Sequence, residues 1–395
     1  MKQAVVRSIS PGLSQKGIRN HNERLILSLL QRHGPMPGGD LSRLAGLSPP
    51  TVSTILRSLE NDGLLSRGEP VRGRVGKPST PMAIAPDGAF SWGLKIGRRS
   101  CDLLVMDFTG TVRLQDRLTY ERPRPRDVLD FVDEGIARLS DRLDPADLAR
   151  ICGIGVAAPF EMWGRRPAAP PFTAWTETDL RADIARITGL PVFVMNDATA
   201  ACQAEHVYGR GRAFRDYAYF FVGAFVGGGI VLNHSVFEGR QGNAGALGSL
   251  RSIGPNGESM QLVDMASIHV LEQRLHEGDI DPAVLWREPQ DWTSISRQVE
   301  PWLGQTAQEL SKAILSTCSV IDFEAVLIDG AFPPAIRAEL VERTRRYLAN
   351  QDTRGLIAPE VQSGVIGSNA RGIGAACAPL FAQFMLNTNA GLSVG

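Results

Sequence analysis

The chain has 395 residues, 43% of them hydrophobic, which is enough for two to four domains of ordinary size and excludes a largely disordered protein. Its 42 basic and 42 acidic side chains give a formal net charge of zero, so a chain that is basic throughout is excluded as well. The balance is uneven, because residues 1–82 hold twelve basic side chains against five acidic ones, a net charge of +7, and residues 83–395 carry −7. This asymmetry favours a basic module that contacts a polyanion, joined to a mildly acidic body.

The spacing of the cysteines and the length of the apolar stretches indicate the cellular compartment of the protein. The five cysteines lie about 50 residues or more apart and their number is odd, so neither a disulfide framework nor a paired-thiolate zinc site is indicated. Lys2 and Arg7 lead into polar sequence, unlike a signal peptide. The longest apolar stretch, residues 217–232, contains four glycines and is too short and too broken to span a bilayer. We therefore expect a soluble, cytoplasmic protein that does not contact a membrane.

Three short helical patterns open the chain. The first is expected to begin at a capping box formed by Asn20 and Glu23. A second is expected at about residues 40–45. The third opens with Ser48 as N-cap and Pro49 at the first helical position. Helix, turn and helix in this arrangement predict a helix-turn-helix domain.

The third helix presents an open face of small polar residues and one arginine, namely Thr51, Ser53, Thr54, Arg57 and Ser58. Short hydroxyl side chains let a helix lie deep in the major groove, and an arginine reaches base edges or phosphates. These five residues are therefore predicted to contact DNA. The alternative is a plain three-helix bundle.

A strand-like hairpin begins at Leu64, and its tip, residues 71–80, carries three cations with no acidic residue between them. These cations are Arg72, Arg74 and Lys77. Glycines within the tip permit close approach of the backbone, so we expect a wing that lies along the phosphates or in the minor groove. The alternative is a solvated loop.

From about residue 82 onward, short strands alternate with helices. Three consecutive antiparallel strands, two helices and two further strands complete a first α/β lobe, and a second lobe repeats the scheme. The expected strands are 91–96, 101–107, 111–120, 151–156, 192–195, 217–222, 229–233 and 325–328, and the expected helices are 126–142, 178–187 and helices within 260–276 and 291–317. Two similar α/β lobes imply a cleft between them.

Six segments, taken in their order and spacing, resemble a known family. They are 93–112, 153–159, 196–198, 226–230, 243–245 and 367–376. The sequence resembles the bacterial ROK proteins (repressors, open reading frames and kinases). The resemblance implies an α/β fold class in which an N-terminal winged helix-turn-helix is followed by a two-lobed actin/hexokinase-like, ribonuclease H-like ROK domain. The expected domains are 1–82, a first lobe at 83–197, and a second lobe at 198–395 with a dimerisation surface.

The kinase motifs of that family are altered. Asp197 matches the position of the family's general base. Where the family has Asp-Ile-Gly-Gly-Thr, residues 95–99 read Lys-Ile-Gly-Arg-Arg, so a carboxylate is replaced by a cation, and two arginines fill space that a triphosphate needs. Phe225 stands where backbone would meet phosphate in the second loop. We expect no enzymatic activity, no catalytic residue beyond Asp197 as a relic, and no cofactor.

The family's zinc and sugar motifs are altered too. Its Ala-Gly-Glu-Ile-Gly-His is Ala-Gly-Ala-Leu-Gly-Ser at residues 244–249, and residues 253–261 replace its cysteine run, so no metal site is expected. The resemblance leaves six candidate ligand-binding residues, which are Asn196, Asp197, Gly245, Ser249, Gln261 and Asp264. The alternative is that Asp197 is a structural relic.

A weaker motif begins at Gly153, where Gly-x-Gly-x-x-Ala looks like a dinucleotide-binding fingerprint. Pro159 follows directly and argues against the helix whose N-terminus would hold a pyrophosphate.

Together these features favour a DNA-binding transcriptional regulator, specifically a repressor. Its expected partners are a double-stranded DNA operator, a small-molecule effector that is a sugar or resembles one, and a second copy of itself, as a homodimer or a dimer of dimers. Two alternatives stay open. One is an ATP-dependent hexose or amino-sugar kinase with an accessory DNA-binding domain, and the other is a DNA-binding scaffold whose sensor no longer binds a ligand.

Overall fold

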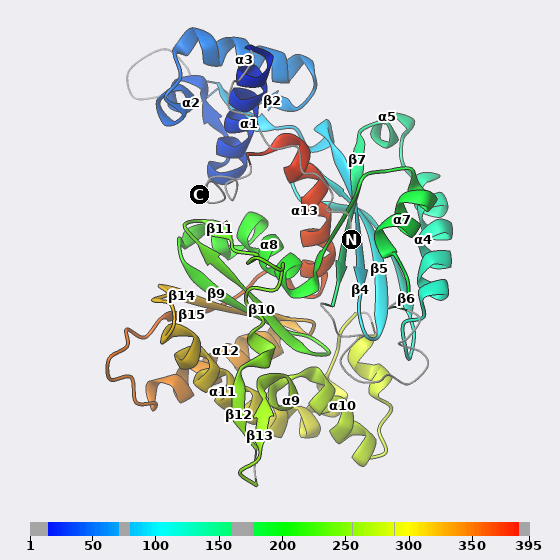
Figure 1. The fold of residues 1–395 in the computed structure, drawn as a ribbon, viewed down its shortest axis with the longest axis vertical. Coiled ribbons are helices and arrows are strands. Elements are labelled where there is room, and N and C mark those ends of the chain that lie inside the picture. Colours follow the sequence, from blue (N-terminus) through cyan, green and yellow to red (C-terminus); the bar gives the residue numbers. More distant parts are fainter. Residues whose placement is uncertain are drawn as a thin grey trace.

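The computed structural model describes residues 15–70, 80–159, 175, 177–254, 256–287 and 289–386, with side chains described from residue 20 onward. An N-terminal winged helix-turn-helix domain lies at one end of the molecule, and two α/β lobes form the body (Figure 1). The predicted fold class is confirmed. No helix in the described part of the chain has the length and apolar character needed to cross a membrane.

The N-terminal domain consists of three helices and a small antiparallel sheet in the order β1-β3-β2. Its elements are α1 (Gln15–His33), β1 (Met36–Pro37), α2 (Gly38–Ala45), α3 (Pro49–Asn61), β2 (Leu65–Arg67) and β3 (Pro81–Ile84). Ile26, Leu41 and Val52 are fully buried between the helices. The predicted helix-turn-helix and the start of its wing are confirmed.

One of the helix caps predicted from the sequence is confirmed, and another is wrong. The Ser48 side chain accepts a hydrogen bond from the backbone N–H of Thr51 at 3.4 Å and fixes the start of α3, as predicted. The expected capping box at Asn20 is wrong, because α1 begins five residues earlier, at Gln15, and Asn20 lies inside it.

The first lobe is a five-stranded sheet in the order β6-β5-β4-β7-β8, with helices of the lobe on one face and the C-terminal helix of the chain on the other (Figure 1). Its elements are β4 (Phe90–Ile96), β5 (Ser100–Asp107), β6 (Val112–Thr119), α4 (Pro125–Ser140), α5 (Pro145–Leu148), β7 (Ile151–Ala158), α7 (Leu180–Thr188) and β8 (Val192–Asn196). The three antiparallel strands at its start are confirmed. β4 and β5 are buried along their whole length, as expected for a sheet covered on both faces.

The second lobe is a five-stranded sheet in the order β11-β10-β9-β14-β15. Its strands are β9 (Tyr217–Val222), β10 (Val226–Leu232), β11 (Ser235–Val236), β14 (Ala325–Gly330) and β15 (Glu360–Ser363), with a small ribbon of β12 (Arg251–Ile253) and β13 (Ser259–Gln261). Its helices are α8 (Asp197–Tyr208), α9 (Leu262–Ala266), α10 (Ile268–Glu277), α11 (Ser296–Cys318), α12 (Pro334–Ala349) and α13 (Ala370–Phe384). The short 3-10 helices among the described residues are η1 (Pro86–Gly88), η2 (Arg210–Ala213), η3 (Leu247–Ser249), η4 (Pro282–Trp286), η5 (Thr293–Ile295) and η6 (Gly367–Asn369).

The C-terminal helix α13 returns to the first lobe and lies between its sheet and α8 (Figure 1). Two glycines permit this close packing. A Cβ on Gly155 of β7 would lie closer than 3.0 Å to the carbonyl of Ala375 in α13, and a Cβ on Gly374 would be as close to the carbonyl of Ala200 in α8. The backbones of β7, α13 and α8 are therefore in direct contact, and α8 and α13 form one closely packed pair.

The N-terminal domain is fixed to the body at the far ends of this helix pair. Gln31 of α1 donates from Nε2 to the carbonyl of Val207 at 3.1 Å, and Arg212 donates to the carbonyl of Gln31 at 3.0 Å. The backbone N–H of Leu386, just after α13, donates to Ser28 Oγ at 2.9 Å. α1 thus contacts the ends of both α8 and α13.

Candidate functional site

The predicted DNA-reading face of α3 is largely open to solvent. Thr51, Ser53, Thr54 and Arg57 are exposed, and Ser58 is half-buried. Two of the hydroxyls already have local partners, since Thr51 shares a hydrogen bond with Ser48 at 2.8 Å and Thr54 donates to the carbonyl of Pro50 at 3.0 Å. Arg57 forms no ion pair within the described residues. Of the five, it is the side chain best able to reach a base or a phosphate.

The cationic tip of the predicted wing, with Arg72, Arg74 and Lys77, lies outside the described residues. The two strands that lead to and from it are described. β2 and β3 pair antiparallel, and Arg67 of β2 makes two hydrogen bonds to Glu60 of α3, at 2.6 and 2.8 Å. This pair fixes the base of the hairpin against the predicted recognition helix.

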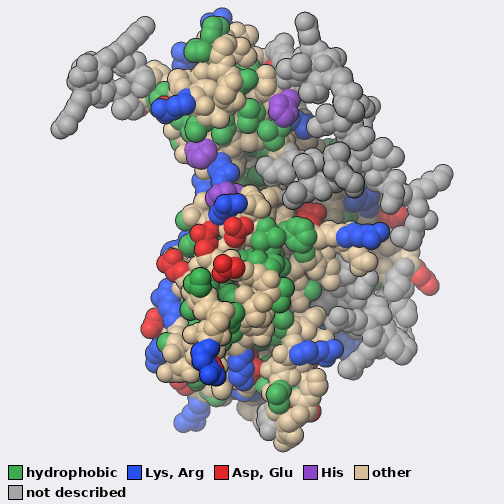
Figure 2. Space-filling view, turned by 60° about the vertical axis from the view of Figure 1, so that its left-hand side comes forward, with side chains coloured by type: hydrophobic (Ala, Val, Ile, Leu, Met, Phe, Trp, Pro, Cys, Tyr) green, Lys and Arg blue, Asp and Glu red, His purple; other side chains and the backbone are tan. Residues whose placement is uncertain are grey.

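Charge is distributed unevenly over the surface. On the face drawn in Figure 2, acidic side chains gather on the body below the N-terminal domain. Basic side chains also lie on this face of the body, so the view shows a local acidic patch and not a uniformly acidic body.

Asn196 and Asp197 lie where β8 meets α8. The Asn196 side-chain oxygen accepts from the backbone N–H groups of Ala198 and Thr199, at 2.9 and 3.1 Å, and caps α8. Only its amide N–H groups remain for a ligand. Asp197 is the first residue of the helix, with a side chain 20% exposed, and its Oδ2 lies 3.4 Å from Arg371 Nη1 of α13. Sequence reasoning missed this arginine, which comes from 174 residues further along the chain.

Three of the other four candidate ligand residues have local structural roles. Gly245 adopts a φ of +75°, and a Cβ there would strike the backbone of Gly229 in β10. Gln261 and Asp264 form a capping box at the start of α9. In it, the backbone N–H of Gln261 donates to Asp264 Oδ2 at 3.1 Å. Ser249 is half-buried in η3. That these residues also bind a ligand stays a prediction.

Lys95, the first residue of the segment that is expected to depart from the kinase motif, has a buried partner of its own. Its Nζ donates to Asp102 at 2.8 Å and to Ser100 at 2.6 Å, and Arg117 pairs with the other oxygen of Asp102. Burial alone would raise the pKa of Asp102, but the two cations outweigh it and hold the pKa at about 2. Burial lowers the pKa of Lys95, and repulsion from Arg371 adds to this.

The two arginines of the altered phosphate loop bridge the lobes. The Arg98 guanidinium lies 4.8 Å from the ring centre of Phe225 in the second lobe. Arg99 donates to both carboxylate oxygens of Glu272 in α10, at 2.9 and 3.2 Å, and the same carboxylate accepts from Trp286 at 2.9 Å. Arg98 and Arg99 thus connect the two lobes at this end of β4.

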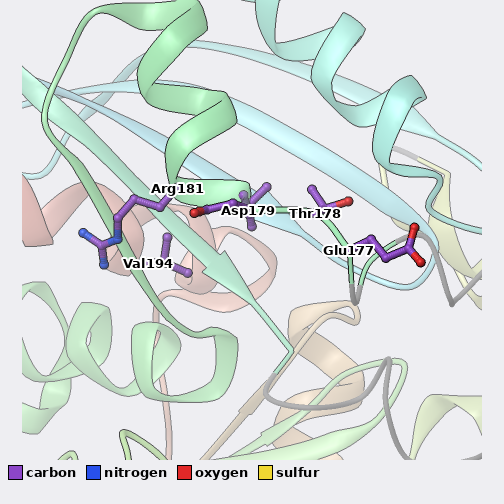
Figure 3. Close-up of a pocket in the computed structure, with 6 residues that line it drawn as sticks. Glu177, Thr178, Asp179, Arg181 and Val194 are labelled. Carbon is purple, nitrogen blue, oxygen red and sulfur yellow. The ribbon is translucent and has the colours of Figure 1, made fainter. Parts of the chain in front are cut away.

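A broad surface hollow of about 470 Å³ lies beside α7 and β8 (Figure 3). Two of its polar side chains are engaged within the fold, since Asp179 caps α7 through the N–H of Ala182 and Arg181 donates to the carbonyl of Val192. None of the six candidate ligand residues lines it, so it is not the effector site that the sequence predicts.

Comparisons with known proteins agree with this architecture. Residues 91–377 match the model of the ROK family, and residues 19–66 match a winged helix-turn-helix DNA-binding model. The "Uncharacterized protein y4fQ" of Sinorhizobium fredii is 24% identical over 92% of this chain and 91% of its own length. The xylose repressor of Bacillus subtilis is 22% identical over 60% of this chain, and the match covers 62% of that repressor, less than two thirds.

Two solved structures show the same fold. One is described as a ROK family transcriptional regulator, a homologue of the E. coli MLC protein, with a TM-score of 0.65 and 19% identity over 93% of this chain and 98% of that one. The other is a ROK family glucokinase from Streptomyces griseus in complex with glucose and AMPPNP, with a TM-score of 0.56 and 21% identity over 73% of this chain and 98% of that one. A structure described as a regulator and one described as a kinase thus share the fold of the body, so that fold alone does not distinguish the two functions.

Proposed function

This chain belongs to the ROK family and carries a winged helix-turn-helix domain, and from this premise we propose that it is a transcriptional repressor that binds double-stranded operator DNA and senses a small molecule with its ROK body. The observation that carries the proposal is the exposed face of α3, with Arg57 at its centre, on a basic domain fixed to an acidic body. The names of related proteins, among them xylose repressors, support the same reading.

We further propose that the protein acts as a homodimer or a dimer of dimers. One recognition helix contacts only a few base pairs, so a repressor of this type needs two copies and a palindromic site with half-sites about one or two helical turns apart. In this proposal residues 1–82 bind DNA, residues 83–197 and 198–395 form the two lobes, and the second lobe provides the dimer surface.

Replacing Arg57 with alanine is expected to weaken operator binding by about 1–3 kcal/mol, roughly 5- to 150-fold, and to relax the preference at one base-pair position. The reason is that Arg57 is exposed on the open face of α3 and is not engaged in an ion pair within the described residues. Footprinting on genomic fragments, followed by titration of the protected site with both proteins, measures the effect.

Arg126→Ala is the matched control, because Arg126 has a side chain 91% exposed on the first lobe, far from α3 in the chain. Among the described residues its ion-pair contact is a long one, 3.7 Å to Asp130. It should bind the operator as the unmodified protein does. Absence of a protected palindrome, or equal losses in the two variants, would contradict the proposal.

The two helices α8 and α13 offer a physical route from the cleft to the DNA-binding domain. α8 begins at the candidate ligand residue Asp197 and ends beside Gln31 of α1, and α13 begins next to Arg371 and ends beside Ser28. We propose that an effector in the cleft changes the position of this helix pair and thereby the spacing of the two recognition helices. A tenfold release from DNA needs about 1.4 kcal/mol of coupling.

A sugar or sugar-like molecule is the effector we propose for this cleft. The free amide N–H groups of Asn196 and the carboxylate of Asp197 could bind hydroxyl groups there. If the ion pair between Asp197 and Arg371 has only a structural role, the body is a scaffold without a ligand. A thermal-shift screen distinguishes these cases, because a ligand that binds only the native state must raise the melting temperature.

We expect no transfer of the γ-phosphate of ATP to hexoses or amino sugars. Lys95 is paired with Asp102 where a kinase would hold a metal-binding carboxylate, and Arg98 packs on Phe225 where the triphosphate would lie. A coupled assay that follows ADP release over a panel of sugars measures this. Turnover near ~1 s⁻¹, the low end for ordinary enzymes, would favour the kinase alternative.

A further inference from the structure

The first strand of the wing directs an arginine toward the last turn of the recognition helix. Leu65 of β2 is only 3% exposed and packs in the hydrophobic core. Arg67, two residues later, lies on the same face of the strand, at the edge of that core. It is paired with Met82 of β3, and the backbone N–H of Gly68 donates to the carbonyl of Pro81 at 2.8 Å. The backbone from which the Arg67 side chain extends is therefore fixed.

Arg67 holds both carboxylate oxygens of Glu60 in α3. Its Nε donates to Oε1 at 2.6 Å and its Nη2 to Oε2 at 2.8 Å, which is the paired geometry that a guanidinium and a carboxylate prefer. The two side chains are 63% and 29% exposed. An exposed ion pair contributes little to folding stability. Its main consequence is that the carboxylate is kept in one place.

Glu60 and Arg57 are neighbours on the surface of α3, because residues three positions apart lie on the same face of a helix. Hydrogen bonds from Arg67 are the main cause that holds the pKa of Glu60 below its ordinary value, and the charges of Arg67 and then Arg57 lower it further. The carboxylate is therefore ionised at neutral pH and lies within the electrostatic reach of Arg57. Released from Arg67, it could pair with Arg57 and would repel nearby phosphates.

We propose that Arg67 is a positioning residue for operator recognition, which holds the carboxylate of Glu60 away from Arg57 and thereby leaves the Arg57 guanidinium to the DNA. This proposal rests on the DNA-binding function proposed above, and it adds to that function a residue outside the recognition face. Arg67 acts through Glu60 and contacts neither a base nor a phosphate.

The test titrates full-length variants on the genomic fragment that footprinting identifies. Arg67→Gln should weaken binding about tenfold, within the range expected for losing Arg57 itself. It should also relax the preference at the same base-pair position as Arg57→Ala does. Adding Glu60→Gln to Arg67→Gln should restore binding to within about twofold of the unmodified protein, because no carboxylate is then left to compete for Arg57. A loss caused by misfolding would not be rescued in this way.

A second measurement shows whether the effect passes through Arg57. In a chain that already carries Arg57→Ala, Arg67→Gln should cause little further loss, since the guanidinium that it protects is gone. Arg186→Gln is the matched control. It breaks an exposed pair with Asp183 in α7 of the first lobe, whose two side chains are 71% and 32% exposed, and it should bind the fragment as the unmodified protein does.

Two results would overturn this proposal alone. One is normal binding by Arg67→Gln. The other is a loss that Glu60→Gln does not restore, which would mean that Arg67 contacts the DNA itself. In both cases the unmodified protein still binds its fragment, so the proposed function stands. If the unmodified protein protects no fragment, the proposed function fails, and this proposal fails with it.

Discussion

Gly374→Ala is expected to destabilise the protein by about 1–3 kcal/mol, although glycine is the poorer helix former. Propensity alone would favour alanine within α13 by up to about 1 kcal/mol. A Cβ at residue 374, however, would lie closer than 3.0 Å to the carbonyl oxygen, the carbonyl carbon and the Cα of Ala200. Since these are backbone atoms of α8, no side chain can turn away, and the two helices have to separate. Overpacking of this kind costs more than the propensity gain.

Gly304 provides the matched control. It lies inside α11, and a Cβ there would meet nothing within 4 Å. Gly304→Ala should therefore raise stability by up to about 1 kcal/mol, so the same substitution has opposite signs at the two sites. Urea unfolding followed by fluorescence measures both. Equal shifts in the two variants would show that α8 and α13 are not in backbone contact.

Local sequence patterns were enough to predict the helix-turn-helix of the N-terminal domain. Ser48 and Pro49 define the start of α3, and its apolar spacing puts Val52 and Ile55 inside. The capping box at Asn20 failed for a local reason. A capping residue starts a helix only if the preceding residues leave the helical conformation, and here α1 already runs through them from Gln15.

Contacts between distant segments could not be read in the same way. Gly155 belongs to a pattern that looks like a nucleotide fingerprint, yet its lack of a side chain makes room for α13, which comes more than 200 residues later. Lys95 reads as the loss of a metal ligand, and only the pairing of β4 with β5 shows that Asp102 lies directly opposite it. The pairing of Asp102 with Lys95 could have been predicted from the sequence, because the turn of a hairpin fixes which residues of its two strands face each other.

The candidate site shows the same limit. The motif order placed Asn196 and Asp197 correctly at the end of β8. It could not show that Arg371 reaches Asp197, because no local signal connects a residue in α13 with the start of α8.

The stability of the protein is expected to fall by about 3 kcal/mol between pH 7 and pH 4 through His206 alone. This side chain lies on α8, with Nε2 3.0 Å from the carbonyl oxygen of His234 and Nδ1 buried without a hydrogen-bond partner in the described structure. Burial lowers its pKa from the ordinary 6.5 to about 4. Between these two values the unfolded chain binds the proton more tightly than the folded one, so acid favours unfolding.

His206→Gln isolates this contribution, because glutamine can still donate to the carbonyl of His234 but does not titrate. Urea unfolding midpoints of both proteins at pH 7.5, 5.5 and 4.5 should diverge only below about pH 6.5, with the variant losing less stability. Burial raises the pKa values of Glu205 and Asp329, which pushes the pH dependence the other way, but these groups are present in both proteins and cancel in the difference. Parallel pH profiles would mean that His206 is accessible to water. Protonation of His206 also affects the contact between the body and the DNA-binding domain. It places a cation near Arg212, whose guanidinium donates a hydrogen bond to the carbonyl of Gln31 in α1.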